Sequence, residues 1–255
     1  CLIIGGGQGG LALAARFKQL NIPAIVIDKN KKPGDTWRNR YHSLCLHDPV
    51  WYDHMPYLQF PDHWPIFSPK DKIGDWLEMY AKIMEINYWG STECINARFD
   101  ELNDEWIVTV EKNGEKLEIK AKHLIFATGM SGMPNHPEIL DSHKFKGDNV
   151  HSSSFTNGSD YKNKNCVVVG SNNSAHDIAA ELWEQGASNV TIIQRSHTTV
   201  ARSSTLLDLQ TRGNFSEQAV KEGINVDIAD LIVASNPYKL VHLDGQKSVK
   251  LLKDI

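Results

Sequence analysis

The stretch Leu2-Ile3-Ile4-Gly5-Gly6-Gly7-Gln8-Gly9-Gly10 decides the fold of this chain. Its first three residues are apolar and predict a short buried strand that leads directly into a glycine-rich turn. Apolar residues then recur at helical spacing over residues 11–20, and residues 24–27 form a second apolar strand. Strand, turn, helix and strand in this order predict a βαβ unit.

The glycines of this turn match the spacing GxGxxG, in which each glycine has its own task. Gly5 permits the tight turn out of the strand, Gly7 lets the backbone approach a pyrophosphate, and Gly10 allows close packing of helix on strand. Asp28 ends the second strand, where an acid accepts hydrogen bonds from an adenosine ribose. Glycine-rich turns also arise for structural reasons alone, but all four parts of the unit occur here in register. The pattern therefore favours a dinucleotide site with its phosphates at the amino end of the helix.

A second segment repeats the pattern. Cys166-Val167-Val168-Val169 predicts a strand, Gly170-Ser171-Asn172-Asn173-Ser174 a turn, and the residues up to Gln185 a helix, followed by a strand over residues 190–193. Gln194-Arg195-Ser196 then replaces the usual acid, and Arg195 offers a donor fork for a 2′-phosphate, which favours NADP over NAD. An exposed arginine at a strand end is the plainer alternative.

Asn172 stands where the middle glycine of the second turn is expected. Because asparagine tolerates a positive φ better than most residues, we expect that the turn can still form with Asn172 in this place. Two nucleotide units with different ribose signals suggest two different cofactors and hydride transfer between them.

The sequence between the two units divides into a loop, a helix and a set of strands. Residues 30–69 are rich in proline and aromatic residues, which suits either the cover of a flat ring system or an aromatic satellite core. The spacing predicts a helix over Lys70 to Ile86. Its core face comprises Ile73, Trp76, Leu77, Tyr80 and Ile83.

Three strand-like runs follow at residues 92–99, 106–110 and 117–121, and Asn113-Gly114 between the last two is a strong hairpin signal. They predict a β-meander attached to the first nucleotide unit. Another apolar strand, residues 123–127, ends in Thr128-Gly129, where a small and a flexible residue let the backbone pass close to a bound cofactor.

Composition limits the function classes. The chain has 255 residues, 41% of them hydrophobic and 23% charged, which excludes a disordered chain. A formal net charge of −4 leaves no basic footprint, so we expect no nucleic-acid partner. The apolar runs are far shorter than the roughly 20 residues that a membrane span needs. Four scattered cysteines without a CxxC pair indicate reduced thiols, no metal site and a cytoplasmic protein.

The segment Phe145-Lys146-Gly147-Asp148-Asn149-Val150-His151-Ser152-Ser153-Ser154-Phe155 fits the fingerprint FxGxxxHxxx followed by an aromatic residue. With it, the chain resembles the flavin-containing monooxygenases, including YUCCA-like and fungal relatives. Gly34-Asp35-Thr36-Trp37 and Phe126-Ala127-Thr128-Gly129 support the resemblance, which runs from Cys1 to about Arg202.

The resemblance implies the cofactors FAD and NADPH. It divides the chain into an FAD-binding domain, 1–150, and a partial NADPH-binding domain, 151–255. The expected fold is α/β with two Rossmann-like dinucleotide-binding domains in three layers and the β-meander. Because the chain opens on Cys1 inside a strand, we expect a fragment of a larger chain. Expected to bind FAD are Gly5, Gly7, Gln8, Gly9, Gly10, Asp28, Lys29, Gly34, Thr36, Trp37, Arg38, Thr128 and Gly129; expected to bind NADPH are Gly170, Ser171, Asn172, Asn173, Ser174, Arg195 and Ser196.

The implied activity is an NADPH-dependent monooxygenase, in which a C4a-hydroperoxyflavin transfers one oxygen atom from O₂ to a small nitrogen, sulfur or 2-oxo-acid substrate. His47, in the segment Ser43-Leu44-Cys45-Leu46-His47, matches the Leu-His of the YUCCA-like branch and is the candidate catalytic residue. It could hydrogen-bond the flavin or peroxide, or simply pack.

Several alternatives stay open. A Baeyer–Villiger monooxygenase ranks second, because such enzymes usually carry Trp where this chain has Phe155. An NADPH oxidase and a non-catalytic nucleotide-binding module are further candidates, and homo-oligomerisation is open. A thioredoxin-reductase-like enzyme is disfavoured because no CxxC can exchange with a flavin.

Overall fold

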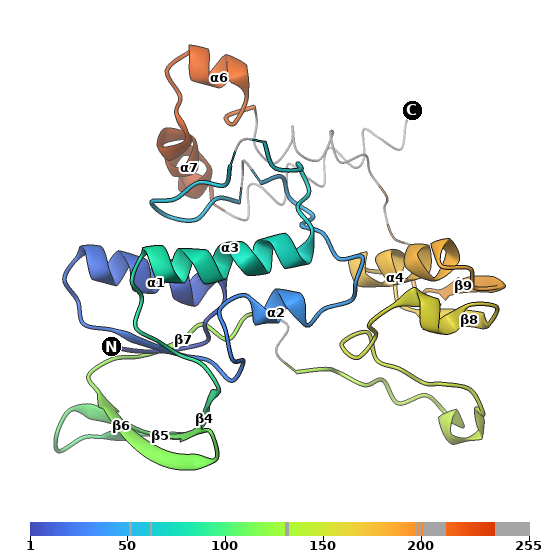
Figure 1. Cartoon of the computed structure of the whole chain (residues 1–255), viewed down its shortest axis with the longest axis horizontal. Coiled ribbons are helices and arrows are strands. Elements are labelled where there is room, and N and C mark those ends of the chain that lie inside the picture. The colour runs from blue at the N-terminus through green and yellow to red at the C-terminus, as the bar shows by residue number, and fades with distance from the viewer. Residues whose placement is uncertain are drawn as a thin grey trace. The chain divides into compact units, whose positions relative to one another are not determined.

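The structure is a computed structural model that describes residues 1–50, 53–61, 63–130, 133–196, 198, 200 and 213–237. The chain is a mixed α/β protein with a parallel sheet (Figure 1). Its described residues divide into two compact units, of which the first comprises Cys1–Val50 and His54–Ser196. In the second unit lie two helices, α6 (Glu217–Lys221) and α7 (Val226–Ser235). The boundary expected at residue 150 stays a prediction.

A four-stranded parallel sheet carries the first predicted unit. Strand β1 (Leu2–Ile4) leads into α1 (Gln8–Gln19) and then into β2 (Ile25–Ile27), which pairs with β1 in parallel. This confirms the first βαβ unit. Strand β7 (Leu124–Phe126) pairs with the other edge of β1, and the sheet order is β3-β2-β1-β7. The two-residue strand β3 (Tyr88–Trp89) was not predicted, because so short a run has no period of its own.

The two faces of this sheet are covered by different elements, as Figure 1 shows. Ile3 and Val26 pack against Ala14 of α1 on one face. Leu2 and Ile27 pack on the other face against the three-stranded antiparallel sheet of β4 (Thr92–Asp100), β5 (Glu105–Lys112) and β6 (Glu115–Ala121). Successive residues of β1 thus point to opposite layers, as a strand buried on both sides requires.

The antiparallel sheet is the predicted meander. Its β5–β6 turn has positive φ at both Asn113 (52°) and Gly114 (85°), the combination that a type I′ hairpin turn needs. The hairpin signal in the sequence is therefore confirmed.

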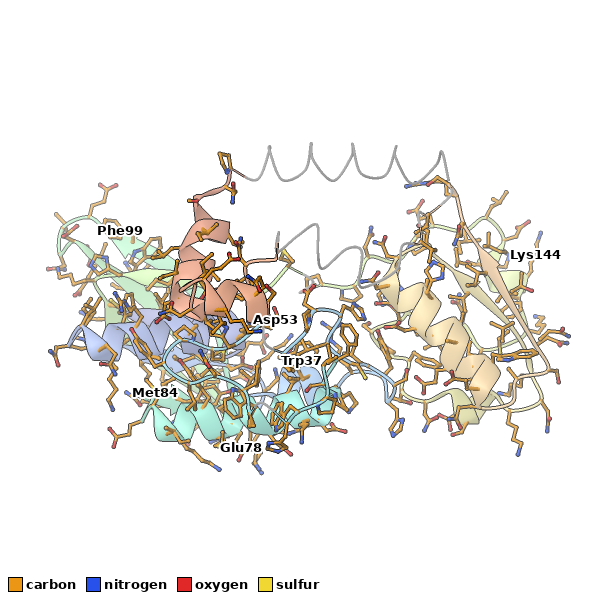
Figure 2. All side chains as sticks on the ribbon, turned by 90° about the horizontal axis from the view of Figure 1, so that it is seen from above. Trp37, Asp53, Glu78, Met84, Phe99 and Lys144 are labelled. Atoms are coloured by element: carbon orange, nitrogen blue, oxygen red, sulfur yellow. The ribbon has the colours of Figure 1, made fainter. Side chains whose placement is uncertain are left out.

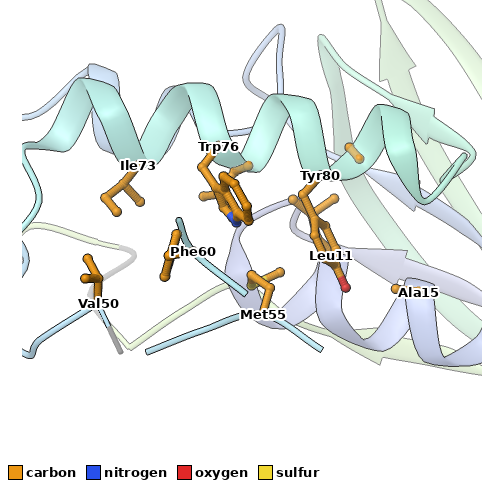
Figure 3. Close-up of a cluster of buried hydrophobic side chains, with 10 residues drawn as sticks. Leu11, Ala15, Val50, Met55, Phe60, Ile73, Trp76 and Tyr80 are labelled. Carbon is orange, nitrogen blue, oxygen red and sulfur yellow. The ribbon is translucent and has the colours of Figure 1, made fainter. Parts of the chain in front are cut away.

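Helix α3 (Lys70–Ile83) lies beside α1 and builds the largest core cluster (Figure 3). Trp76 and Tyr80 pack with Leu11 of α1. Phe60 and Trp64, from the proline-rich loop, stack on each other at 5.3 Å between ring centroids and pack on Trp76. These loop aromatics pack within the α3 core cluster, in line with the aromatic core that was one of the two expectations for this segment. The cover of a flat ring system stays a prediction.

Two expectations for α3 were wrong. The helix ends at Ile83, three residues early, and Ile83 is 55% exposed instead of being part of the core face. The cause is a Schellman cap: Glu85 takes φ +49°, and the amide of Ile86 donates to the carbonyl of Ala81 at 2.9 Å. This reversal places Ile86 against the core in place of Ile83.

The second predicted unit is also present. Strand β8 (Asn165–Val169) is followed by α4 (Asn173–Glu184) and β9 (Asn189–Ile193), and the two strands pair in parallel with Val169 opposite Ile193. Ile178 and Leu182 of α4 form a core with Tyr41 and Phe155. Among the described residues lie three further short elements: α2 (Asp35–Arg38), η1 (Ser142–Lys144) and η2 (Gly158–Tyr161).

Candidate functional site

The turn between β1 and α1 is shaped by close packing at two glycines. Gly5 has φ +108°, and a Cβ there would collide with the carbonyl oxygen of Ala127 and lie 3.2 Å from the amide of Thr128. A Cβ on Gly10 would collide with the carbonyl oxygen of Gly5. The end of β7 and the first turn of α1 thus both touch this turn, which is why neither glycine can carry a side chain.

The other predicted glycines of the turn face open space. A Cβ on Gly7 would meet only the Cγ2 atom of Thr36, at 4.0 Å, and a Cβ on Gly9 would meet nothing within 4 Å. Gly7 is the N-cap of α1, and no side chain caps that end of the helix; Gln8 beside it is exposed. The open space at Gly7 and Gly9 lies beside a helix amino terminus whose amides no side chain caps, and such a place suits a pyrophosphate.

Asp28 holds the backbone around the turn. One carboxylate oxygen accepts from the amide of Gly6 at 2.6 Å, and the other accepts from the amide of Asn30 at 2.7 Å. Each oxygen has a second lone pair, so Asp28 can still accept from ribose hydroxyls. Lys29 next to it is exposed.

Tyr88 is a residue at this turn that the sequence did not single out. Its ring lies against Gly6, and its buried hydroxyl has no hydrogen-bond partner among the described residues. Burial, with the charge of Asp28, raises the pKa of Tyr88, so the phenol stays protonated and able to donate. The only sequence signal would have been an aromatic residue in a strand too short to recognise.

The residues of the Gly34–Arg38 segment divide between two roles. Thr36 is exposed near Gly7, and Trp37 packs partly on the α3 core cluster. Gly34, with φ +87°, touches the carbonyl oxygen of Gly74 in α3. The guanidinium of Arg38 donates at 2.8–3.2 Å to the carbonyl of Pro33 and the carboxylates of Asp35, Asp75 and Glu78.

Arg38 therefore joins α2 to α3, where Trp37 and Glu78 are labelled in Figure 2. Burial disfavours its charge, but the hydrogen bonds to Asp75 and Asp35 outweigh this and raise the pKa of Arg38. Lys82 lowers the pKa of Glu78 through a hydrogen bond, and the charges of Lys32 and Arg38 add to this effect. Because the donors of Arg38 are already engaged with protein, its cofactor-binding role stays a prediction.

Thr128 and Gly129 follow β7 and are exposed beside the glycine turn. Gly129 has φ +80°, and a Cβ there would meet nothing within 4 Å. The structure thus brings three strand ends to one edge of the parallel sheet: the turn after β1, Asp28 after β2 and Thr128-Gly129 after β7.

The second turn forms with Asn172 in place of the middle glycine, as expected. Asn172 is the N-cap of α4 with φ −96°, so the turn needs no positive φ there. The backbone of Asn172 is extended, and its carbonyl accepts from the amide of Ala175 at 2.9 Å, where the helix begins. Gly170 lies between β8 and this N-cap, and a Cβ on Gly170 would lie 3.1 Å from the Cβ of Ala175. Arg195 and Ser196 follow β9 and are exposed.

Asn173 and Ser174 begin α4 and face the segment that holds His47. The amide nitrogen of the Asn173 side chain lies 2.8 Å from Nδ1 of His47, and Nε2 of His47 lies 3.1 Å from the carboxylate of Asp177. The hydroxyl of Tyr41 donates to the same carboxylate at 2.8 Å and also contacts Ser174. Ser171 has contacts of its own within the described chain.

Glu181 forms a second connection between α4 and the His47 segment. It is 3% exposed, and it accepts from the hydroxyl and amide of Ser43 and from the amide of Gly158 at 3.0 Å. Neither Glu181 nor Asp177 was predicted. Their signal was a polar stripe, because Asn173, Asp177 and Glu181 recur every four residues along α4, whose buried face carries the apolar Ala175, Ile178, Ala179 and Leu182.

Other chemistry is less well supported by the described residues. They contain no cluster of three or more residues suited to hold a metal ion. The four cysteines are free, and burial raises the pKa of the Cys45 thiol, with the charge of Asp177 adding to it. Among the described helices, none has both the length and the apolar character to cross a membrane.

A profile of the pyridine nucleotide-disulphide oxidoreductases matches residues 71–249 of the chain. The chain belongs to this family. A probable indole-3-pyruvate monooxygenase, YUCCA9 of Arabidopsis thaliana, is 30% identical over 76% of this chain and 47% of its own length. An uncharacterized CzcO-like oxidoreductase of Geobacillus kaustophilus is 35% identical over 72% of this chain and 51% of its own length. The predicted resemblance to flavin monooxygenases is thereby confirmed. The chain spans about half the length of these relatives.

Solved structures share the fold. A flavin-containing monooxygenase from Stenotrophomonas maltophilia superposes with a TM-score of 0.69 at 22% identity, over 78% of this chain and 59% of the other. The bacillithiol disulfide reductase of Bacillus cereus gives a TM-score of 0.69 at 21% identity, over 81% and 64%. Proteins named for different chemistry thus share this fold, and the site must decide between the reactions.

Proposed function

We propose that this protein is an FAD- and NADPH-dependent monooxygenase, with the two βαβ units as the cores of two Rossmann-like domains. The observation that carries the proposal is the pair of glycine turns. Each lies at the carboxyl end of a parallel strand and leads into a helix whose N-cap residue makes no side-chain capping hydrogen bond. Relatives named as monooxygenases support the reaction class.

The first site fits FAD. Gly7 and Gly9 leave room for the pyrophosphate, whose charge suits the amino end of α1. Asp28 would accept from the adenosine ribose, with Thr36 and Thr128 beside the turn. When bound, FAD would supply the redox chemistry that the resemblance implies, namely reduction by NADPH and activation of O₂.

The second site fits NADPH. The turn from Gly170 to Ser174 would receive the pyrophosphate, and Arg195 would pair with the 2′-phosphate. NADPH, a proton, O₂ and substrate would yield NADP⁺, water and substrate carrying one oxygen atom. The substrate is a small nitrogen or sulfur nucleophile or a 2-oxo acid, and the protein is expected in the cytoplasm. The four cysteines lack a CxxC pair, which favours oxygenation over disulfide reduction.

The test follows the flavin and the oxygen atom together. Purified protein should show a flavin spectrum, and the NADPH-reduced protein mixed with O₂ should oxygenate substrate in near one-to-one ratio with NADPH consumed. Gly7→Val, which fills the open space of the first turn, should abolish FAD binding, whereas Leu102→Ala in the exposed β4–β5 turn should not. A ratio near zero with peroxide released would make the protein an NADPH oxidase, and binding of both cofactors without turnover would make it a nucleotide-binding module.

A further inference from the structure

Residues 41–47 form a short segment, here called the junction segment, that is fixed at both ends by backbone hydrogen bonds. The amide of His42 donates to the carbonyl of Thr156 at 2.9 Å. The amide of Leu46 donates to the carbonyl of Ser68 at 2.8 Å, and the amide of Lys70 donates to the carbonyl of Leu44 at 2.9 Å. His47 therefore extends from an anchored backbone, although its side chain is 43% exposed.

Both ring nitrogens of His47 are engaged by α4. An ionised carboxylate can only accept, so Nε2 must carry the proton that is donated to Asp177 at 3.1 Å. The side-chain amide nitrogen of Asn173 can only donate, so Nδ1, at 2.8 Å, must be unprotonated. Together these partners select one neutral tautomer of the imidazole.

The geometry of α4 explains why both partners reach the same ring. Asn173 and Asp177 are four residues apart, so their side chains lie on one face of the helix. The hydroxyl of Tyr41 donates to the Asp177 carboxylate at 2.8 Å. Burial raises the pKa of Tyr41, and the bond to Asp177 raises it further, so the phenol remains a donor.

We propose that Asp177 and Asn173 are positioning residues that hold His47 in its Nε2–H tautomer, and that His47 senses nucleotide in the second site through Asn173. The second clause rests on the proposed function. Asn173 is the first residue of α4 and belongs to the turn from Gly170 to Ser174 that is proposed to receive the pyrophosphate. A phosphate there competes for the Asn173 amide as a charged acceptor and takes the donor away from Nδ1. Filling the NADPH site thus changes the hydrogen bonding of His47 on the junction segment.

The test measures the ¹⁵N chemical shifts of the His47 ring nitrogens by nuclear magnetic resonance, in flavin-loaded protein whose histidines are labelled with ¹⁵N. His47→Gln identifies the His47 signals by their loss. Wild-type protein without nucleotide should show one protonated and one unprotonated nitrogen for His47. Asp177→Ala should give averaged shifts from a mixture of tautomers, whereas Tyr41→Phe and Asp160→Asn, an exposed residue of η2, should keep the single tautomer. A wild-type pattern in Asp177→Ala would overturn the positioning role.

The coupling is tested with NADP⁺, whose binding is followed in parallel by calorimetry. NADP⁺ should move the Nδ1 signal of wild-type His47, and in Asn173→Ala the signal should start displaced and not move further. Binding of NADP⁺ with no change at His47 would overturn the coupling alone. Failure to bind NADP⁺ would overturn both the coupling and the proposed function, while the tautomer in the nucleotide-free protein still decides the role of Asp177.

Discussion

Arg195 is the residue on which the choice between NADPH and NADH depends. It follows β9, is exposed, and makes no hydrogen bond or ion pair with the described part of the chain, so its guanidinium is available to a ligand. We expect Arg195→Ala to raise the KM for NADPH by roughly 10- to 100-fold, since charge-assisted hydrogen bonds contribute about 1.5–3 kcal/mol. The KM for NADH should stay unchanged in steady-state assays. Equal losses with both nucleotides would show that Arg195 does not bind the 2′-phosphate.

Arg38 differs from Arg195, because its guanidinium N–H groups already donate hydrogen bonds to other residues of the protein. Lysine keeps the charge but cannot serve Pro33, Asp35, Asp75 and Glu78 at once. We expect Arg38→Lys to lower the free energy of unfolding by about 1–3 kcal/mol in urea titrations, with an unchanged dissociation constant for FAD. The exposed Arg98→Lys on β4 is the control. Weaker FAD binding at unchanged stability would instead assign Arg38 to the cofactor.

At the scale of elements, the β1–α1 turn combines two kinds of glycine. Gly10→Ala places a methyl group against the carbonyl of Gly5, and such overpacking costs about 1–3 kcal/mol or more. Gly9→Ala in the same helix meets nothing within 4 Å and should raise stability by about 0.5–1 kcal/mol, the usual gain of alanine over glycine in a helix. Thermal unfolding of the cofactor-free variants measures both. The packing argument fails if Gly10→Ala is as stable as Gly9→Ala.

Elements with a clear period were predictable from the sequence, and their ends were not. Both βαβ units and the meander follow from periods of 3.6 and 2 together with glycine and Asn-Gly turns. The exposure of Ile83 could not be predicted from the sequence, because the helix cap at Glu85 decides whether Ile83 or Ile86 packs against the core. A strand of two residues such as β3 has too few positions to show a period.

At the scale of the whole molecule, the contacts that join distant segments were the least predictable. Tyr41 and Asp177 are 136 residues apart, and Ser43 and Glu181 are 138 apart, so no local spacing connects them. Asn173, Asp177 and Glu181 share one face of α4, but their spacing alone does not identify the segment that this face contacts. His47 was singled out by resemblance, but its bonds to Asn173 and Asp177 emerge only from the fold.

Glu181 provides the test of this long-range connection, because one buried carboxylate links the junction segment, η2 and α4. The backbones of η2 and α4 lie close together at this point, since a Cβ on Gly158 would lie 2.7 Å from the carbonyl oxygen of Glu181. Glu181→Gln replaces one accepting oxygen with an NH₂ group that faces a donor, either at Ser43 or at Gly158. An unmet buried donor costs about 1–3 kcal/mol, so the free energy of unfolding should fall by that amount relative to Glu184→Gln, an exposed change on the same helix. Amide hydrogen exchange should accelerate at Ser43 or at Gly158, whichever amide faces the new NH₂ group, because that amide loses its acceptor. Exchange rates equal to those of Glu184→Gln would contradict this. The contact between the junction segment, η2 and α4 would then depend on apolar packing around Phe155 and Ile178 and not on the Glu181 carboxylate.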